Sequence, residues 1–208
     1  MRKSLVSILF CSITVISVAQ IPVQILGGHE ATEYNFMWDG DLDSAGRVNL
    51  FNFTFFNLDY ESPDNHAYEI YQVATYNFTN NWGLAGGGRF TMGRFSPQMA
   101  MSFQIFTKDL YLNLFPTLQY LPATERLGYS MFGILIYQPQ INDRWNIFSQ
   151  ITLEPLFDNE GHIYSYQQLR FGLGYRNLFQ FGLGANLEQI GRNFQSNENY
   201  GLFIRKEF

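Results

Sequence analysis

Apolar and polar residues alternate along most of the chain with a period of two. In residues 99–105 the odd positions are apolar, whereas Ser102 and Gln104 occupy the other parity. The same alternation recurs over residues 110–119, 145–154 and 179–188. A helix would repeat every 3.6 residues, so this pattern predicts β-strands with one apolar and one polar face.

The predicted strands are long, and connectors of two kinds separate them. The strands run over about 10–13 residues, the length of a tilted strand that crosses a membrane. Tight turns are expected at 80–81, 108–109, 141–143 and 176–177, and longer polar connectors at 61–65, 94–98, 121–126, 158–161 and 191–197. Outer-membrane barrels have short periplasmic turns and longer external loops, so we assign the tight turns to the periplasm.

The connectors also predict the number of strands. They divide the chain into ten strands from Arg47 onward, and residues 21–27 and 31–38 supply two more. The prediction is therefore an all-β fold, a transmembrane antiparallel up-and-down β-barrel of twelve strands. Ten strands with an N-terminal segment, or a long soluble β-sandwich, are the alternatives. Residues 47–60 and 128–138 are apolar on both parities, which leaves their registers open.

The N-terminus has the features of a cleaved secretion signal. Arg2 and Lys3 precede an apolar stretch that ends in small residues at 17–19, as a signal peptidase requires. We therefore expect residues 1–19 to be a signal peptide and residues 20–208 to form a single barrel domain. A membrane anchor or a buried helix is the alternative interpretation of this stretch.

Composition supports a barrel and excludes several other classes of protein. Aromatic residues make up 18% of the chain, charged residues only 15%, and the mean hydropathy is −0.13. Disordered chains have few aromatics and high charge, and helical membrane proteins need apolar runs of about 20 residues. Without residues 1–19 the chain has 11 basic and 18 acidic residues, a balance of −7, and no cysteine. A nucleic-acid partner is therefore not expected.

The C-terminal residues point to a location. Tyr200, Leu202, Ile204 and Phe208 share one face, and only Lys206 departs from the apolar pattern. This ending resembles the terminal strand of bacterial outer-membrane barrels, and the resemblance implies that the barrel-assembly machinery reads Phe208. We expect the chain to lie in the outer membrane of a Gram-negative bacterium, surrounded by outer-membrane lipid.

Parity separates the residues expected to face the lumen from those expected to face lipid. Tryptophans and tyrosines near the strand ends fall on the lipid face, where aromatic girdles form. The residues expected to line the lumen, as a channel or as a polar core, are Glu69, Arg89, Lys108, Tyr111, Glu154, Tyr164, Tyr166 and Arg170. Glu33, Glu188, Glu207 and Arg205 share this inward parity.

Two functions are compatible with such a lumen. One is a narrow passive channel in which charges order the path of a small polar solute and tyrosines stack on it. The other is a closed structural or assembly-partner barrel in which carboxylates pair with arginines and nothing passes. Twelve strands lie between the filled eight-stranded barrels and the open sixteen-stranded porins, so size alone does not separate the two. We favour the channel.

A lipid hydrolase or acyltransferase is a further alternative. Such barrels use a serine with a histidine, and the chain has Ser62 near His66 and Ser165 near His162. An active pair would require a serine–histidine hydrogen bond at the lipid boundary. No G-x-S-x-G is present, and no two histidines share a face at metal-ligand spacing. We therefore expect no catalytic residues, no enzyme activity, no metal and no cofactor.

One short stretch resembles a known family of channels. Residues Phe55-Phe56-Asn57-Leu58-Asp59-Tyr60 are similar to a stretch of the nucleoside-specific channel family. The twelve predicted strands and the expected lumen rich in aromatic and charged residues are part of the same similarity. No binding residue is transferred from it.

Overall fold

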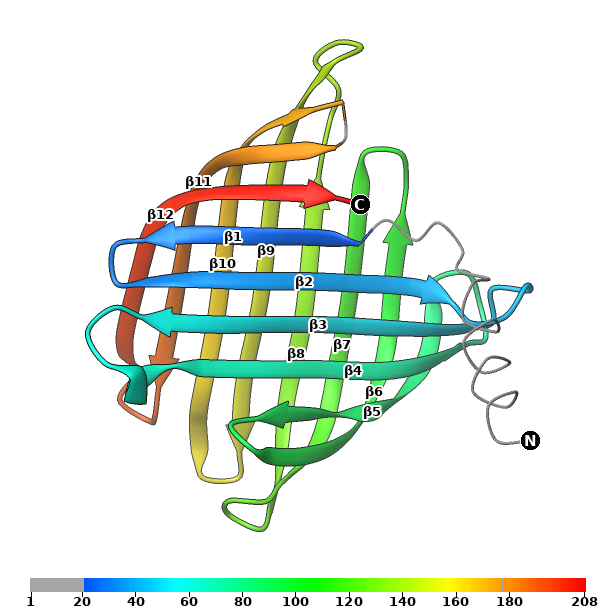
Figure 1. The fold of residues 1–208 in the computed structure, drawn as a ribbon. Helices are drawn as coiled ribbons and strands as arrows, with labels where there is room; N and C mark the ends of the chain where they lie inside the picture. The colour runs from blue at the N-terminus through cyan, green and yellow to red at the C-terminus, as the bar shows by residue number, and fades with distance from the viewer. Residues whose placement is uncertain (1–20, 177) are drawn as a thin grey trace, which may run out of the picture.

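The computed structural model describes residues 21–176 and 178–208, and within them the chain forms one closed antiparallel barrel (Figure 1). Each strand pairs with its neighbours in the chain, and β1 closes the barrel against β12. The strands are β1 (Pro22–Gly28), β2 (Ala31–Asp41), β3 (Val48–Asp59), β4 (Ala67–Asn77), β5 (Trp82–Thr91), β6 (Arg94–Phe106), β7 (Leu110–Leu121), β8 (Arg126–Tyr137), β9 (Trp145–Asp158), β10 (Gly161–Tyr175), β11 (Phe179–Ile190) and β12 (Gln195–Glu207). A short 3₁₀ turn, η1 (Pro63–Asn65), follows β3.

The predicted fold class is confirmed, and the count is twelve strands in the described residues, not ten. Residues 22–28 and 31–41 form the first two strands, joined by a two-residue turn. The predicted signal peptide, residues 1–19, lies outside the described residues. In that described part, no helix is both long and apolar enough to cross a membrane.

The connectors fall into two groups at opposite ends of the barrel. The end that holds residues 21 and 208 also holds the connectors after β2, β4, β6, β8 and β10, and we call it the N/C end. The connectors after β1, β3, β5, β7, β9 and β11 lie at what we call the far end. This grouping is the one predicted from the sequence.

The predicted difference in connector length is wrong. Far-end connectors have two to seven residues, and those at the N/C end have three to seven. Residues 94–98 belong to β6, and the turn before them is Met92-Gly93, with both residues at positive φ. Residues 195–197 likewise belong to β12. Inward polar residues and a proline in a strand look like a loop in the sequence, because the lumen of the barrel tolerates polar side chains.

Two prolines interrupt the ladders, as their missing N–H groups require. The β6–β7 pairing has a gap beside Pro116, and the β8–β9 pairing has a gap beside Pro155. A register shift between His162 and Tyr164 in β10 lies next to the residue that pairs with Pro155. The wall is therefore irregular close to the far end of β8, β9 and β10.

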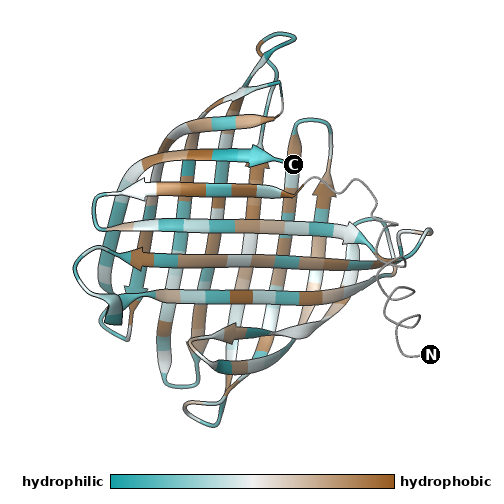
Figure 2. Cartoon of the chain, viewed as in Figure 1, coloured by the Kyte–Doolittle hydropathy of each residue, from teal (hydrophilic) through white to brown (hydrophobic). Residues whose placement is uncertain are grey.

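The outer face of the barrel is an apolar surface. Hydropathy alternates along the ribbons in Figure 2, and the outward positions remain exposed although most are apolar. Leu183 and Leu202 are both 67% exposed and Phe171 is 64% exposed. Soluble proteins rarely expose contiguous apolar patches larger than a few hundred Å². Near the strand ends aromatic rings pack in pairs, as Trp145 does on Tyr175 at 4.9 Å between ring centroids.

The two strands whose register the sequence left open, β3 and β8, each turn phenylalanines into the barrel, whereas Phe56, Tyr129 and Tyr137 of the same strands lie exposed on the outer face. Phe51 and Phe53 of β3 and Phe132 of β8 point into the barrel and are no more than 2% exposed. They pack with Tyr71 of β4 and Phe115 of β7, and we call these five residues the aromatic cluster. The front and rear walls cross steeply in Figure 1, and this crossing lets side chains of β3 reach β7 and β8.

Candidate functional site: a polar column through the barrel

The structure places seven of the eight predicted lumen residues on the inner wall. These seven residues and their partners in the strand ladders share the inward parity, and most of the seven are deeply buried. The seven are Glu69, Arg89, Tyr111, Glu154, Tyr164, Tyr166 and Arg170. Lys108 differs, because it lies past the end of β6 in the turn to β7. Its Nζ donates to Gln140 Oε1 at 3.0 Å at the rim of the N/C end.

The centre of the polar part of the lumen is Glu33 of β2, which is 1% exposed. Arg170 Nη2 lies 3.0 Å from Glu33 Oε1, and Gln168 Nε2 donates to the same oxygen at 2.6 Å. Asn186 Nδ2 donates to Glu33 Oε2 at 2.6 Å, and the Tyr166 hydroxyl and Asn35 also donate to this carboxylate. A buried carboxylate with five donors is fully satisfied, which a buried charge requires.

Hydrogen bonds continue from Glu33 toward the N/C end. Gln168 Oε1 accepts from Gln150 Nε2 at 2.9 Å, and Gln150 Oε1 accepts from Arg205 Nη1 at 2.9 Å. Arg205 reaches Glu207 Oε1 at 3.4 Å. We call Glu33, Gln168, Arg170, Gln150, Arg205 and Glu207 the polar column. It consists of side chains alone and passes through the barrel along the walls formed by β2, β9, β10 and β12.

Glu33 has the inward parity in the sequence but was not among the predicted site residues. Its central position depends on partners 133 to 153 residues later in the chain. No local signal distinguishes Glu33 from the other inward acids, so only the closed barrel identifies it.

A second buried ion cluster joins β4, β5 and β9, and its Glu154 lies beside Tyr166 in the β9–β10 ladder. Arg89 of β5 is paired with Glu154 of β9, and its Nε lies 3.5 Å from Glu69 Oε1. The guanidinium also lies 5.5 Å from the centroid of the Tyr71 ring, at the edge of the aromatic cluster. Arg89 thus connects β4 and β5 to β9, which is not their neighbour in the barrel.

Tyr111 joins a third polar contact near the N/C end. Its hydroxyl donates to Asp39 Oδ2 at 2.6 Å, and Asn49 Nδ2 donates to Asp39 Oδ1 at 2.6 Å. Tyr166 is also engaged, since its ring stacks on Phe55 at 5.5 Å between centroids with an interplanar angle of 2°. Phe55 therefore covers one face of the Tyr166 ring.

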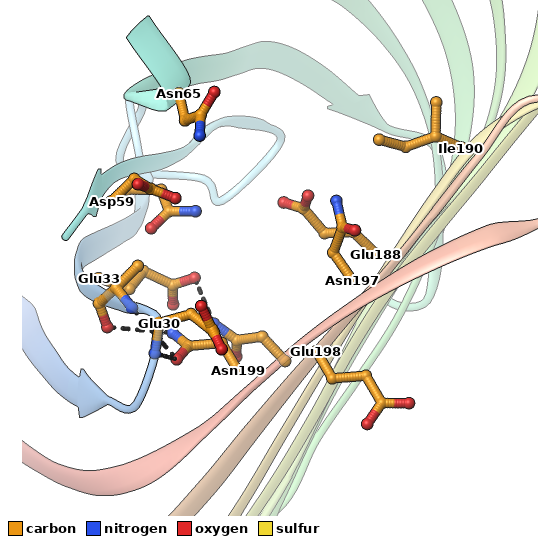
Figure 3. A pocket seen from close by; sticks show the side chains of 12 residues that line it. Glu30, Glu33, Asp59, Asn65, Glu188, Ile190, Asn197, Glu198 and Asn199 are labelled. Carbon is orange, nitrogen blue, oxygen red and sulfur yellow. Dashed lines mark hydrogen bonds between the residues drawn. The ribbon is translucent and has the colours of Figure 1, made fainter. Parts of the chain in front are cut away.

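Cavities lie at both ends of the polar column. At the far end a cavity of about 540 Å³ is lined by carboxylates and amides, with Asp59 and Asn65 on one side and Glu188 and Asn197 on the other (Figure 3). Glu33 is one of the residues that line it. A second far-end cavity of about 460 Å³ shares Glu188 and is lined by Arg89, Glu69 and Tyr164. At the N/C end a cavity of about 260 Å³ is lined by Lys108, Tyr111 and Glu207.

Two different groups of side chains therefore fill most of the lumen. The aromatic cluster bridges β3 and β4 to β7 and β8, with Phe51 at 5.3 Å from Phe115 and 5.5 Å from Phe132. The polar column runs along β2, β9, β10 and β12, where Phe148 and Phe203 are also buried, and it ends in a cavity at each mouth. Side chains, and no inserted backbone segment of the described residues, close the middle of the barrel.

The comparisons define the class of protein by its fold. No protein family and no curated protein matches this sequence. Among solved structures, the NanC porin matches 91% of this chain and 100% of its own at 12% identity and a TM-score of 0.50. The KdgM porin covers 91% and 99% at 11% identity and 0.48, and LpxR from Salmonella typhimurium covers 91% and 100% at 9% identity and 0.45. The chain has the fold of a porin-like outer-membrane barrel.

Proposed function

We propose that this protein is a barrel of the Gram-negative outer membrane that acts as a narrow, passive channel for small polar solutes. The observation that carries the proposal is the polar column, which joins a cavity at the far end to a cavity at the N/C end. Its middle is closed by side chains, so conduction requires these side chains to part and admit water.

Parting the polar column costs little compared with parting the aromatic cluster. Amide and guanidinium groups that leave one another can bond to water instead. The net value of such a hydrogen bond is about 0.5–1.5 kcal/mol between neutral groups and about 1.5–3 kcal/mol where a charged group takes part. Separating the aromatic rings would expose apolar area at about 25 cal/mol per Å². The solute path therefore follows Glu33, Gln168, Gln150 and Arg205.

The far-end cavity sets the class of solute. Its lining includes Glu30, Glu33, Asp59, Glu188 and Glu198, and its other polar residues are asparagines. Like charges repel in such a cavity, which disfavours anions. Amides and carboxylates accept and donate hydrogen bonds to hydroxyl and amine groups. Neutral or weakly cationic polar solutes are the proposed cargo.

Conductance of single barrels in planar bilayers tests the channel. We expect a small, fluctuating conductance in the wild type, which added nucleosides or sugars reduce. Gln150→Ala removes the side chain that bridges Gln168 and Arg205, so we expect a larger conductance in this variant. Leu183→Ala, on the outer face, is the matched control and should conduct like the wild type. No conductance in the wild type, with unchanged traces for Gln150→Ala, Arg89→Ala and Arg170→Ala, would contradict the proposal.

The second candidate is a closed structural or assembly-partner barrel. The aromatic cluster favours it, because those rings tie opposite walls together as a core does. This candidate predicts the silent traces just described, together with a loss of membrane integrity when the gene is deleted. It makes no use of the two cavities at the ends of the polar column.

Orientation and partners complete the proposal. We propose that the N/C end faces the periplasm and that Phe208 is recognised by the barrel-assembly machinery. Lys206, which departs from the apolar pattern, has its Nζ 4.1 Å from the centroid of the Phe208 ring and 5.6 Å from that of Phe179. Its charge is thus covered by aromatic faces where it meets lipid.

Cysteine labelling on whole cells tests the orientation, because the predicted mature chain has no cysteine. Asn193→Cys lies in the β11–β12 connector at the far end and Asn80→Cys in the β4–β5 connector at the N/C end. A membrane-impermeant maleimide should label position 193 and not position 80. The reverse labelling pattern would show that the N/C end faces the cell exterior and would contradict the proposed orientation.

A further inference from the structure

A serine–histidine pair lies on the outer face of the barrel near the far end. His162 Nε2 is 2.7 Å from Ser165 Oγ, and His162 Nδ1 is 2.7 Å from the carbonyl oxygen of Gly191. A carbonyl oxygen can only accept, so Nδ1 carries the proton in the neutral ring. Nε2 is then the acceptor for the serine hydroxyl. This is the tautomer in which a histidine can act as a general base.

An irregularity of β10 brings the two side chains onto one face. Residues three apart in a regular strand point to opposite faces, so His162 and Ser165 would be separated. The register shift between His162 and Tyr164 inserts one extra residue. His162 now pairs with Phe157, which is an exposed outward residue, and Ser165 keeps the outward parity of Leu169 and Phe171. Bulges of this kind often re-aim side chains beside active sites.

The pair has a defined environment. His162 is 5% exposed and Ser165 is 6% exposed. The imidazole stacks under Phe194 at 4.1 Å between centroids, and Phe157 meets its edge at 5.3 Å. Phe194 belongs to the four-residue connector between β11 and β12, the element that must move to admit a substrate. Gln189 lies directly opposite Ser165 in the β10–β11 ladder and brings a carboxamide to the same face.

An apolar groove continues down the same face. It has a volume of about 710 Å³ and runs over β9 to β12, lined by Ile151, Leu169, Phe171, Leu183, Tyr200 and Leu202. Leu169 is four residues from Ser165 along β10, which corresponds to about 13 Å at 3.3 Å per residue. An acyl chain in the groove would therefore place an ester group near Ser165, at the level where lipid headgroups begin.

We propose that Ser165 and His162 form a nucleophile and general base that hydrolyse an acyl ester of a membrane lipid. Ser165 Oγ bonds to the ester carbonyl carbon while its proton passes to His162 Nε2. The bond from that carbon to the alcohol oxygen breaks, and His162 returns the proton to the leaving alcohol. Water then attacks the acyl-serine with His162 as base, which releases a carboxylic acid and restores Ser165. Gln189 is the side chain placed to donate to the oxyanion.

The outer-face site is independent of conductance through the lumen. His162 and Ser165 face away from the polar column, so a barrel that does not conduct could hydrolyse lipid and a conducting barrel could fail to do so.

The chain also contains an internal control. Ser62 Oγ accepts from the backbone N–H of Asp64, and His66 Nε2 bonds to the carbonyl of Asp59, so this second serine and histidine are not joined.

The test is covalent labelling of the full folded barrel in lipid bilayers with an alkyl fluorophosphonate, followed by identification of the modified peptide. We expect label on Ser165 in the wild type, none there in Ser165→Ala, and a labelling rate at least about 100-fold lower in His162→Gln, since a general base contributes 10²–10⁴-fold. Ser62→Ala and His66→Gln should label like the wild type. The heat-dependent gel shift of each variant reports that it is folded.

Ester hydrolysis gives a second readout. Activity toward p-nitrophenyl esters should rise with acyl length, and Leu183→Trp, which fills the groove, should remove the preference for long chains without abolishing activity on short ones. A folded wild-type barrel that takes no label at Ser165 and hydrolyses none of these esters would overturn the proposal. Labelling that survives His162→Gln unchanged would do so as well.

Discussion

The polar column and the aromatic cluster fill one lumen by opposite means. In the polar column a single carboxylate, Glu33, gathers donors from β2, β10 and β11. In the aromatic cluster the five rings pack with centroids mostly 5–6 Å apart and need no partner of a particular polarity. Both groups of side chains hold opposite walls together. They differ in how much stability is lost when one side chain is removed, and in whether water can take the place of that side chain.

The first and largest expected effect is in the polar column. Glu33→Ala leaves Arg170 without its partner carboxylate, and an unpaired buried charge costs about 3–5 kcal/mol. We expect the free energy of unfolding in urea, measured with the barrel in lipid or detergent, to fall by that amount. Glu198→Ala removes an exposed acid and should change it by less than about 0.5 kcal/mol.

The double variant Glu33→Ala/Arg170→Ala sharpens this prediction. It removes both charges, so it should be more stable than Glu33→Ala alone. If it loses the sum of the two single effects, the ion pair is not what stabilises the polar column.

The second effect is in the aromatic cluster. Phe132→Ala removes a ring that contacts Phe51, Phe53 and Tyr71, and truncating a buried phenylalanine costs about 3–5 kcal/mol. Because an apolar cavity stays dry, this loss should not be accompanied by increased conductance. Phe171→Ala on the outer face is the control. Higher conductance in Phe132→Ala than in Gln150→Ala would reverse the roles assigned to the aromatic cluster and the polar column.

The third effect is smaller and concerns the contact between Tyr111 and Asp39. Tyr111→Phe removes one hydrogen bond to a carboxylate that Asn49 also contacts, so we expect a loss of about 1.5–2 kcal/mol. Tyr137→Phe, at an exposed outward position, should lose almost nothing. Equal effects of the two variants would mean that the Asp39 contact adds no stability.

The smallest effect is expected for ion pairs at the rim. Arg192 and Arg126 both contact Glu160 at the far end, where their side chains are 62% and 39% exposed. Exposed pairs contribute about 0–1 kcal/mol and are screened by salt. Arg192→Ala should therefore lower stability by less than about 1 kcal/mol, and 1 M NaCl should abolish the difference. A loss as large as that of Glu33→Ala would show that burial does not distinguish these ion pairs.

The predictability of the site differs between residues for a physical reason. Glu69, Arg89, Glu154 and Arg170 were expected to face the lumen because parity alone decides the direction of a side chain in a regular strand. The hydrogen bond between His162 and Ser165 could not be predicted in this way. The register shift in β10 changes parity between them, and such a shift depends on the neighbouring strand as well as on the local residues.

The sequence by itself determined that the chain forms long antiparallel strands, that twelve of them close a barrel, and which face most residues occupy. Period-two alternation is a local property of the sequence, so it can be recognised without knowing which strands pair with one another. Only the tertiary structure decided that Phe51 meets Phe132, that Glu33 meets Arg170, and that a polar column and an aromatic cluster fill most of the lumen. These contacts join strands that are not neighbours in the ladder. They depend on how steeply the walls of the closed barrel cross, which no local pattern records.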